Sequence, residues 1–81
     1  MPLQDELREY ITVSSLREKV PEGFSDDYNL IEKEALDSLA FMELITHVAD
    51  HYRIELGEED ITPENFGTIN MLVSFVESKL T

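Results

Sequence analysis

Hydrophobic residues recur along this chain with helical spacing, and no segment alternates as a half-buried strand would. Near the N-terminus, Leu3, Leu7, Tyr10 and Ile11 recur every three or four residues, with charged residues between them. This spacing predicts a first helix, which must end before Pro21 because proline cannot continue a helix.

The clearest amphipathic pattern predicts a second helix from about Ser38 to about Tyr52. Asp37 stands at the expected N-cap, where a carboxylate accepts unpaired N–H groups of the first turn. Leu39 and Met42 project away from the apolar stripe at roughly 100° per residue, so they should lie on the surface. The stripe itself consists of Phe41, Leu44, Ile45, Val48 and Tyr52.

A long connection, from Pro21 to Asp37, separates these two helices. It contains acidic and turn-forming residues, but its apolar residues should hold it against the core, and a structured loop of this length is often functional. These apolar residues are Phe24, Tyr28, Leu30, Ile31 and Leu36.

The C-terminal third begins with an acidic turn, Glu58-Glu59-Asp60-Ile61. Thr62 should cap a short helical turn that opens with Pro63 and closes at Gly67. Thr68 should then cap a last helix. Its apolar face consists of Ile69, Leu72, Val73, Val76 and Leu80, while Met71 and Phe75 should pack against the short turn or line a pocket.

These patterns predict an all-α, four-helix bundle: three main helices, one short helix and a long first loop. Eighty-one residues without cysteine leave room for one core, so residues 1–81 should form a single domain without disulfides. We expect a monomer.

The chain is strongly acidic, with 18 Asp and Glu against six Lys and Arg and a formal net charge of −12. This charge repels nucleic acids and anionic membranes and attracts partners with basic patches. No apolar run is long enough to span a bilayer, and the first six residues lack the pattern of a signal peptide. We therefore expect a cytoplasmic location.

Ser38 has two interpretations: an ordinary helix-start residue, or a point where a phosphate-bearing group is attached at the positive end of a helix dipole. A catalytic serine would need a base within reach. The two histidines, His47 and His51, lie at least about 13 Å further along the same helix by axial rise. We therefore do not expect an enzyme.

Two segments share part of the pattern of a metal site. His47 and His51 share a helix face with spacing that suits zinc, but a third strong ligand is not evident, so a solvated helix side is favoured. The acidic loop from Asp26 to Asp37 fails as a calcium-binding EF-hand, because its sixth position is Ile31 rather than glycine.

The sequence Asp37-Ser38-Leu39, followed by Glu43-Leu44, resembles the acyl carrier protein family. The resemblance covers nearly the whole chain and includes the helix order, the long loop, the acidity and the short third helix. It implies that a magnesium-dependent phosphopantetheinyl transferase attaches 4′-phosphopantetheine to Ser38, within a motif that includes Asp37. It also implies partner docking through Leu39, Met42 and Glu43.

The chain departs from the family pattern at two places. The family usually has a glycine two or three residues before D-S-L, whereas Glu34-Ala35-Leu36 contains no glycine. Many fatty-acid carriers also have a row of acidic residues late in the second helix, and here that row is reduced to Ala49-Asp50-His51. The segment from Ile61 to Phe66 is more similar to stand-alone aminoacyl, D-alanyl or peptidyl carriers.

The resemblance implies a carrier of acyl or aminoacyl thioesters. Its partners would be an adenylating loading enzyme and downstream acyl-transferring enzymes with basic docking patches. The alternative is an acidic helical interaction module without a prosthetic group. A third hypothesis is a metal-binding regulator that uses His47 and His51.

Overall fold

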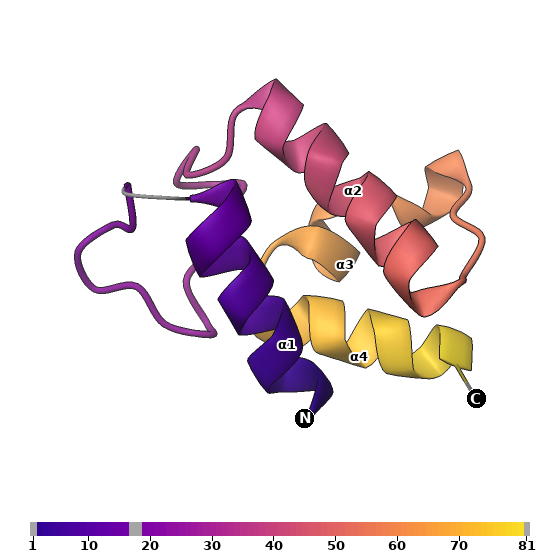
Figure 1. The fold of residues 1–81 in the computed structure, drawn as a ribbon. Helices are drawn as coiled ribbons and strands as arrows, with labels where there is room; N and C mark the ends of the chain where they lie inside the picture. The colour runs from indigo at the N-terminus through magenta and orange to yellow at the C-terminus, as the bar shows by residue number, and fades with distance from the viewer. Residues whose placement is uncertain (1, 17–18, 81) are drawn as a thin grey trace.

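The computed structural model describes residues 2–16 and 19–80, and its regular elements are all helical (Figure 1). This confirms the predicted all-α bundle of three main helices and one short helix. In chain order the elements are α1 (Leu3–Tyr10), the π-helical η1 (Ile11–Ser15), α2 (Ser38–Tyr52), the 3-10 turn η2 (Glu58–Asp60), α3 (Pro63–Phe66) and α4 (Ile69–Leu80).

One hydrophobic core joins the helices. α1 and α3 pack on α4, and α2 packs on both η1 and α4 (Figure 1). The predicted stripe of α2 is confirmed, since Leu44 and Val48 are fully buried and Phe41, Ile45 and Tyr52 pack against the core. The buried residues are Leu7, Ile11, Leu16, Leu30, Leu44, Val48, Phe66, Ile69, Leu72, Phe75 and Val76.

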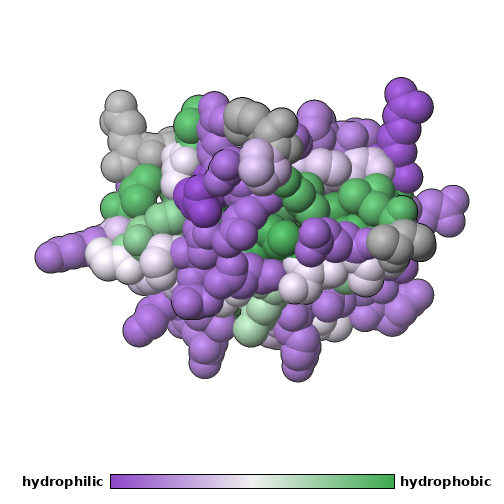
Figure 2. Space-filling view, turned by 90° about the horizontal axis from the view of Figure 1, so that it is seen from below, coloured by the Kyte–Doolittle hydropathy of each residue, from purple (hydrophilic) through white to green (hydrophobic). Residues whose placement is uncertain are grey.

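The surface matches the acidic, polar composition. On the face seen in Figure 2, hydrophilic residues in purple cover most of the area, and hydrophobic residues in green show between them. Within the described ranges, no helix has both the length and the apolar character needed to cross a membrane.

The first helix changes its hydrogen-bond pattern at Ile11. The Leu16 N–H donates to the Ile11 carbonyl at 2.7 Å, five residues back, as in a π turn. This spacing lets Ile11 and Leu16 both face the core, where both are buried. Residues 17 and 18, between this turn and Pro21, lie outside the described ranges.

The long first loop is held against the bundle, as predicted. Asp26 accepts hydrogen bonds from Gln4 and Arg8 of α1, while its carbonyl accepts from the Asn70 N–H of α4. Further along, the Leu30 N–H donates to the Gly67 carbonyl at 2.7 Å.

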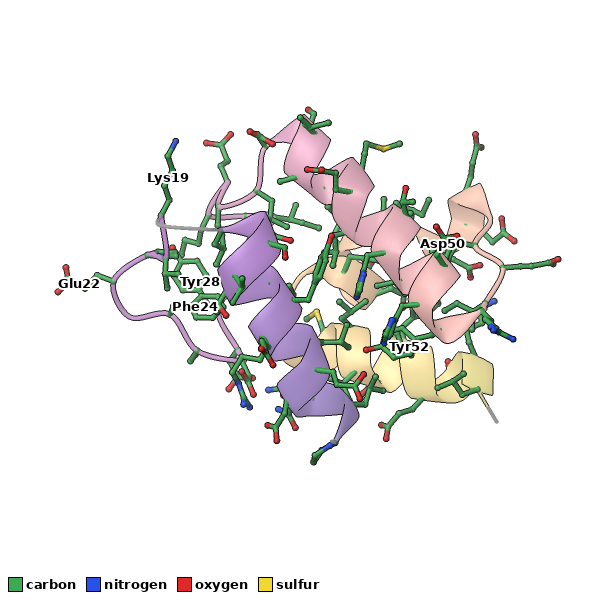
Figure 3. All side chains as sticks on the ribbon, viewed as in Figure 1. Lys19, Glu22, Phe24, Tyr28, Asp50 and Tyr52 are labelled. Atoms are coloured by element: carbon green, nitrogen blue, oxygen red, sulfur yellow. The ribbon has the colours of Figure 1, made fainter. Side chains whose placement is uncertain are left out.

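The aromatic and aliphatic residues of the loop complete this contact. Leu30 is buried, and Phe24, Tyr28, Ile31 and Leu36 pack against the core. Phe24 and Tyr28 lie beside α1 in Figure 3, with ring centroids 5.8 Å apart. The loop is therefore a structured wall of the molecule.

Two expectations for the C-terminal third were wrong. Thr62 makes no side-chain cap; its carbonyl instead accepts from the N–H groups of Asn65 and Phe66, at 3.1 and 3.0 Å. Leu80 is 54% exposed, because the last turn of α4 extends past the elements that cover its earlier apolar residues.

Other predictions for this region are confirmed. The Thr68 hydroxyl accepts from the Met71 N–H at 3.0 Å and so caps α4. Phe75 is buried against Phe66 of α3, with ring centroids 5.6 Å apart. Met71 is partly exposed and lines a shallow groove beside Phe75.

Candidate functional site

The start of α2 lies where the sequence predicts it. Asp37 has extended backbone, and its Oδ1 accepts the Ala40 N–H at 2.8 Å, which confirms the N-cap. The first intrahelical bond runs from the Phe41 N–H to the Asp37 carbonyl at 2.9 Å. The N–H groups of Ser38 and Leu39 come before the first intrahelical hydrogen bond, so they lie at the positive end of the helix dipole.

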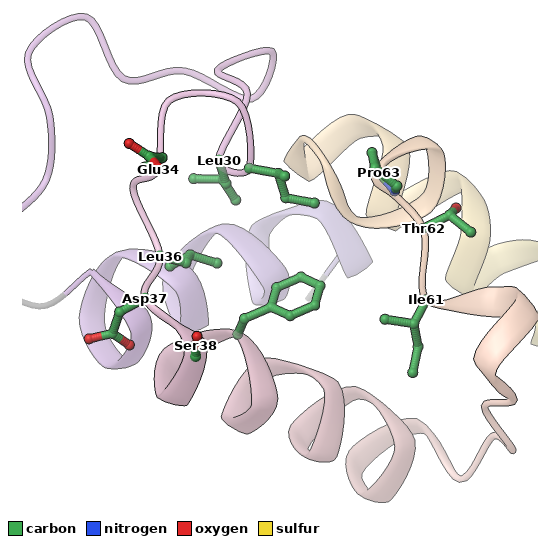
Figure 4. Close-up of a pocket in the computed structure, with 10 residues that line it drawn as sticks. Leu30, Glu34, Leu36, Asp37, Ser38, Ile61, Thr62 and Pro63 are labelled. Carbon is green, nitrogen blue, oxygen red and sulfur yellow. The ribbon is translucent and has the colours of Figure 1, made fainter.

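Ser38 is the first residue of α2, and its side chain is exposed at the mouth of a groove of about 630 Å³. In Figure 4, Leu36 and Ile61 point into this space from opposite sides, while the Asp37 carboxylate points away from it. We call this space the apolar groove. Its lining residues are Leu30, Ile31, Glu34, Leu36, Asp37, Ser38, Phe41, Ile61, Thr62 and Pro63.

One wall of the apolar groove is a helical turn with defined caps at both ends. Asn29 Oδ1 accepts the Ile31 and Glu32 N–H groups, at 3.1 and 2.8 Å. At the other end, the Ala35 N–H donates to the Leu30 carbonyl at 3.0 Å. Glu34 between them has a φ of 52°, the left-handed conformation of a Schellman cap.

This geometry explains one departure noted in the sequence. A glycine adopts positive φ without steric cost, whereas the side chain of Glu34 opposes it. Glu34 therefore takes the turn conformation before Asp37 that glycine would favour.

The opposite wall is held by an acidic residue that is not itself part of the lining. Asp60 Oδ2 accepts the Gly57 N–H at 3.1 Å and pairs with Lys79 Nζ at 3.2 Å. The Gly57 hydrogen bond, with a smaller contribution from Lys79, holds the pKa of Asp60 below its usual value. The Asn65 side chain also donates to the Asp60 carbonyl at 2.8 Å, which ties η2 to α3.

The candidate docking residues share one exposed side of α2. Leu39 and Met42 are 69% and 59% exposed, the positions predicted for them, and Glu43 is exposed beside them. The Tyr10 hydroxyl donates to the Glu43 carbonyl at 3.4 Å, so this side of α2 adjoins α1.

His47 does not lie on a fully solvated helix side, contrary to expectation. Its ring stacks on Tyr10 with centroids 3.7 Å apart and an angle of 8° between the planes. Burial, with a smaller contribution from His51, lowers the pKa of His47. His51 remains exposed, and its Nε2 lies 3.5 Å from Glu6 Oε1.

This histidine cluster is part of the α1–α2 contact rather than of the Ser38 site. The Tyr52 hydroxyl donates to Glu6 at 3.2 Å, and burial together with this carboxylate raises the pKa of Tyr52 to about 12. Across the described ranges, no group of three or more His, Cys, Asp or Glu side chains is arranged to hold a metal ion.

Several residues at the site escaped prediction from the sequence. The sequence predicts a turn at Ile61, Thr62 and Pro63, but nothing in its pattern indicates that they line a groove with Ser38. One feature of the sequence could have indicated the π turn. It is the β-branched run Ile11-Thr12-Val13, because β-branched side chains crowd a regular helix.

Comparisons with known proteins agree with this geometry. The family described as "Phosphopantetheine attachment site" matches residues 5–76. The chain is 32% identical over 75 residues to the "Anthracycline acyl carrier protein DauA" of Streptomyces sp. (strain C5), an alignment that covers 93% of this chain and 87% of that protein. No solved structure matches the chain.

Proposed function

The chain belongs to the acyl carrier protein family with its phosphopantetheine attachment site, and from this premise we propose that Ser38 is the attachment residue. Members are carriers rather than enzymes, and they hold 4′-phosphopantetheine covalently. The proposal is based on the position of Ser38, which is the exposed first residue of α2 and lies at the mouth of the apolar groove.

The chain's own residues fit such a group. The Ser38 hydroxyl offers the oxygen for a phosphodiester, and the N–H groups at the start of α2 stabilise the phosphate's negative charge. Asp37 holds the first turn of α2 in place through its bond to the Ala40 N–H, and this turn carries Ser38. When bound, the arm supplies a terminal thiol for thioester formation, which the chain cannot supply because it has no cysteine.

The apolar groove supports acyl cargo. Leu30, Ile31, Leu36, Phe41 and Ile61 present hydrocarbon side chains within a space of about 630 Å³. Burying an alkyl chain there is favourable at roughly 0.8 kcal/mol per methylene group. The relative's printed name, an acyl carrier protein, agrees with acyl rather than aminoacyl cargo, and the aminoacyl subtype stays a prediction.

The proposed partners follow from surface charge and shape. They are a phosphopantetheinyl transferase, a loading enzyme and downstream acyl-transferring enzymes, each with a basic patch facing this acidic chain. Leu39 and Met42 would supply apolar contacts and Glu43 a charge-paired contact. We further propose that residues 1–81 act as one cytoplasmic, monomeric domain and that neither nucleic acid nor membrane is a partner.

Intact-mass measurement tests the attachment site. Incubation with coenzyme A and a promiscuous phosphopantetheinyl transferase should add one phosphopantetheine to the native protein and none to Ser38→Ala. Ser74→Ala, which changes an exposed serine on α4, is the matched control and should be modified normally. Equal modification of Ser38→Ala would exclude Ser38, and no modification of the native protein would favour the interaction module without a prosthetic group.

A loading experiment tests the cargo. Holo protein is loaded with a panel of fatty acyl and aminoacyl groups, and the rate of thioester hydrolysis is measured for each. Fatty acyl thioesters should hydrolyse most slowly, because the apolar groove shields them. Preferential retention of aminoacyl groups would contradict acyl cargo while leaving the attachment site intact.

A further inference from the structure

The apolar groove ends where the hydrophobic core begins, and Phe41 lies at this boundary. Phe41 lines the groove and is only partly buried, whereas Leu44, one turn further along α2, is fully buried. On α3, Pro63 lines the groove, and Phe66, one turn further along the same face, is fully buried in the core. Both helices therefore run from the groove into the core.

The ring of Phe41 separates the groove from an aromatic part of the core. It meets the ring of Phe66 edge to face, with centroids 5.9 Å apart and an angle of 73° between the planes. Phe66 in turn contacts Phe75 of α4, with ring centroids 5.6 Å apart. Edge-to-face packing is an arrangement that aromatic pairs prefer, so the Phe41 ring is held where it closes the inner side of the groove.

The walls of the groove are fixed to the rest of the molecule through the backbone. The Leu30 N–H donates to the Gly67 carbonyl at 2.7 Å, and a side-chain hydrogen bond ties η2 to α3. A side chain at position 67 would bring its Cβ within 2.5 Å of the Pro63 carbonyl oxygen, so the turn that closes α3 is tightly packed. Passage from the groove into the core therefore depends on the Phe41 side chain rather than on movement of a wall.

We propose that Phe41 determines the length of the acyl chain that the carrier can shield. This inference rests on the proposed attachment at Ser38 and on acyl cargo in the apolar groove. Ser38 and Phe41 are three residues apart, so they share one side of α2, and both line the groove. Burial of each methylene group is favourable until the chain meets the Phe41 ring, and further methylene groups remain in water. Short acyl chains are therefore shielded completely and long ones only in part.

The test compares straight-chain acyl groups of increasing length. The transferase loads Ser38 from a series of acyl-coenzyme A thioesters, from acetyl to palmitoyl, and intact mass follows hydrolysis relative to the free coenzyme A thioester. In native protein, each added methylene group should slow hydrolysis by up to about 4-fold, the effect of burying it fully, until a limiting length is reached. In Phe41→Ala the slowing should continue to longer chains, because loss of the ring opens space beside Phe66. Phe41→Leu should give an intermediate limit.

Val73→Ala is the matched control. Val73 is partly buried and packs against the core from α4, away from the lining of the groove. Its truncation loosens the core without opening the groove. The limiting length should therefore stay at the native value in Val73→Ala, even if the melting temperature falls as far as in Phe41→Ala.

Nuclear magnetic resonance with an isotope-labelled terminal methyl group on the acyl chain gives a second readout. In native protein we expect nuclear Overhauser contacts from this methyl group to Phe41 and Leu36 and none to Phe66. In Phe41→Ala, the methyl group of a long chain should contact the ring of Phe66.

Four outcomes overturn the inference: contacts to Phe66 in native protein, hydrolysis that does not depend on chain length, the same limiting length in native protein and Phe41→Ala, or an equal shift in Val73→Ala. If Phe41→Ala does not fold, Phe41→Leu and the contacts in native protein still decide. Failure of the proposed attachment is recognised separately, since the transferase would then add no mass at Ser38.

Discussion

The ring of His47 in α2 lies flat on the ring of Tyr10 in α1, 3.7 Å between centroids. His51 continues the stack, 5.0 Å from His47. Glu6 lies against the same cluster and links His51 and Tyr52 to α1. α1 and α2 are thus joined through a stack of aromatic rings and a shared carboxylate.

The free energy of unfolding should fall as the pH is lowered through the histidine range. Burial lowers the pKa of His47 below its usual 6.5, with His51 adding to the effect and Asp50 and Glu6 opposing it. The unfolded chain therefore takes up a proton first, so stability is full above pH 6.5 and declines until His47 is protonated in the folded state as well. Urea unfolding between pH 7.5 and 5 measures this decline.

Variants separate this effect from the general acidity of the chain. His47→Phe keeps an aromatic ring on Tyr10 and should flatten the pH dependence between pH 7.5 and 5. His51→Gln, the control at the exposed histidine, should retain most of it. An unchanged slope in His47→Phe would show that other groups are responsible.

Glu34→Gly should stabilise the protein. Glu34 has positive φ, which costs a non-glycine residue roughly 1–2 kcal/mol, and glycine's greater freedom in the unfolded chain offsets part of the gain. We expect a net increase of up to about 1 kcal/mol, which raises the melting temperature by roughly 4–8 °C. Glu32→Gly removes the same charge from the same turn, and it should not stabilise.

Asp37→Ala should remove the cap of α2. Loss of the bond to the Ala40 N–H costs about 1 kcal/mol for a typical N-cap. Because the same turn carries Ser38, modification by the transferase should also slow. Asp37→Asn keeps a side-chain oxygen at the cap and should restore most of the stability; calorimetry and timed intact-mass measurements follow the two effects.

Met42→Glu should weaken partner binding without unfolding the chain. Met42 is more than half exposed, whereas Leu44, two positions on, is fully buried. Transferase turnover should fall for Met42→Glu at an unchanged melting temperature. Leu44→Ala, by contrast, should cost about 2–5 kcal/mol of stability. A large loss of stability in Met42→Glu would contradict its surface position.

The predictable parts of the structure are those that depend on residues close in sequence. The bounds of α2, its Asp37 cap and the exposure of Leu39 and Met42 follow from helical periodicity and local hydrogen bonding. The Thr68 cap belongs to the same class. Each is decided within one or two turns of helix.

The unpredicted parts depend on contacts between distant segments or on backbone detail. His47 lies off the apolar stripe of α2, and the ring of Tyr10, far away in sequence, stacks on it and helps to bury it partly. Glutamate rarely adopts a positive φ, so the residue type of Glu34 does not predict its left-handed backbone. Thr62 has the right residue type for a cap, but the backbone of the turn supplies the bonds instead.

The bond between Leu30 and Gly67 joins the wall beside Ser38 to the segment before α4. Asp26 likewise ties the same loop to both α1 and α4. The surroundings of the serine are therefore complete only after segments from both ends of the chain have met. A transferase that recognises this surface would therefore modify only folded chains, and the attached arm would distinguish folded chains from unfolded ones.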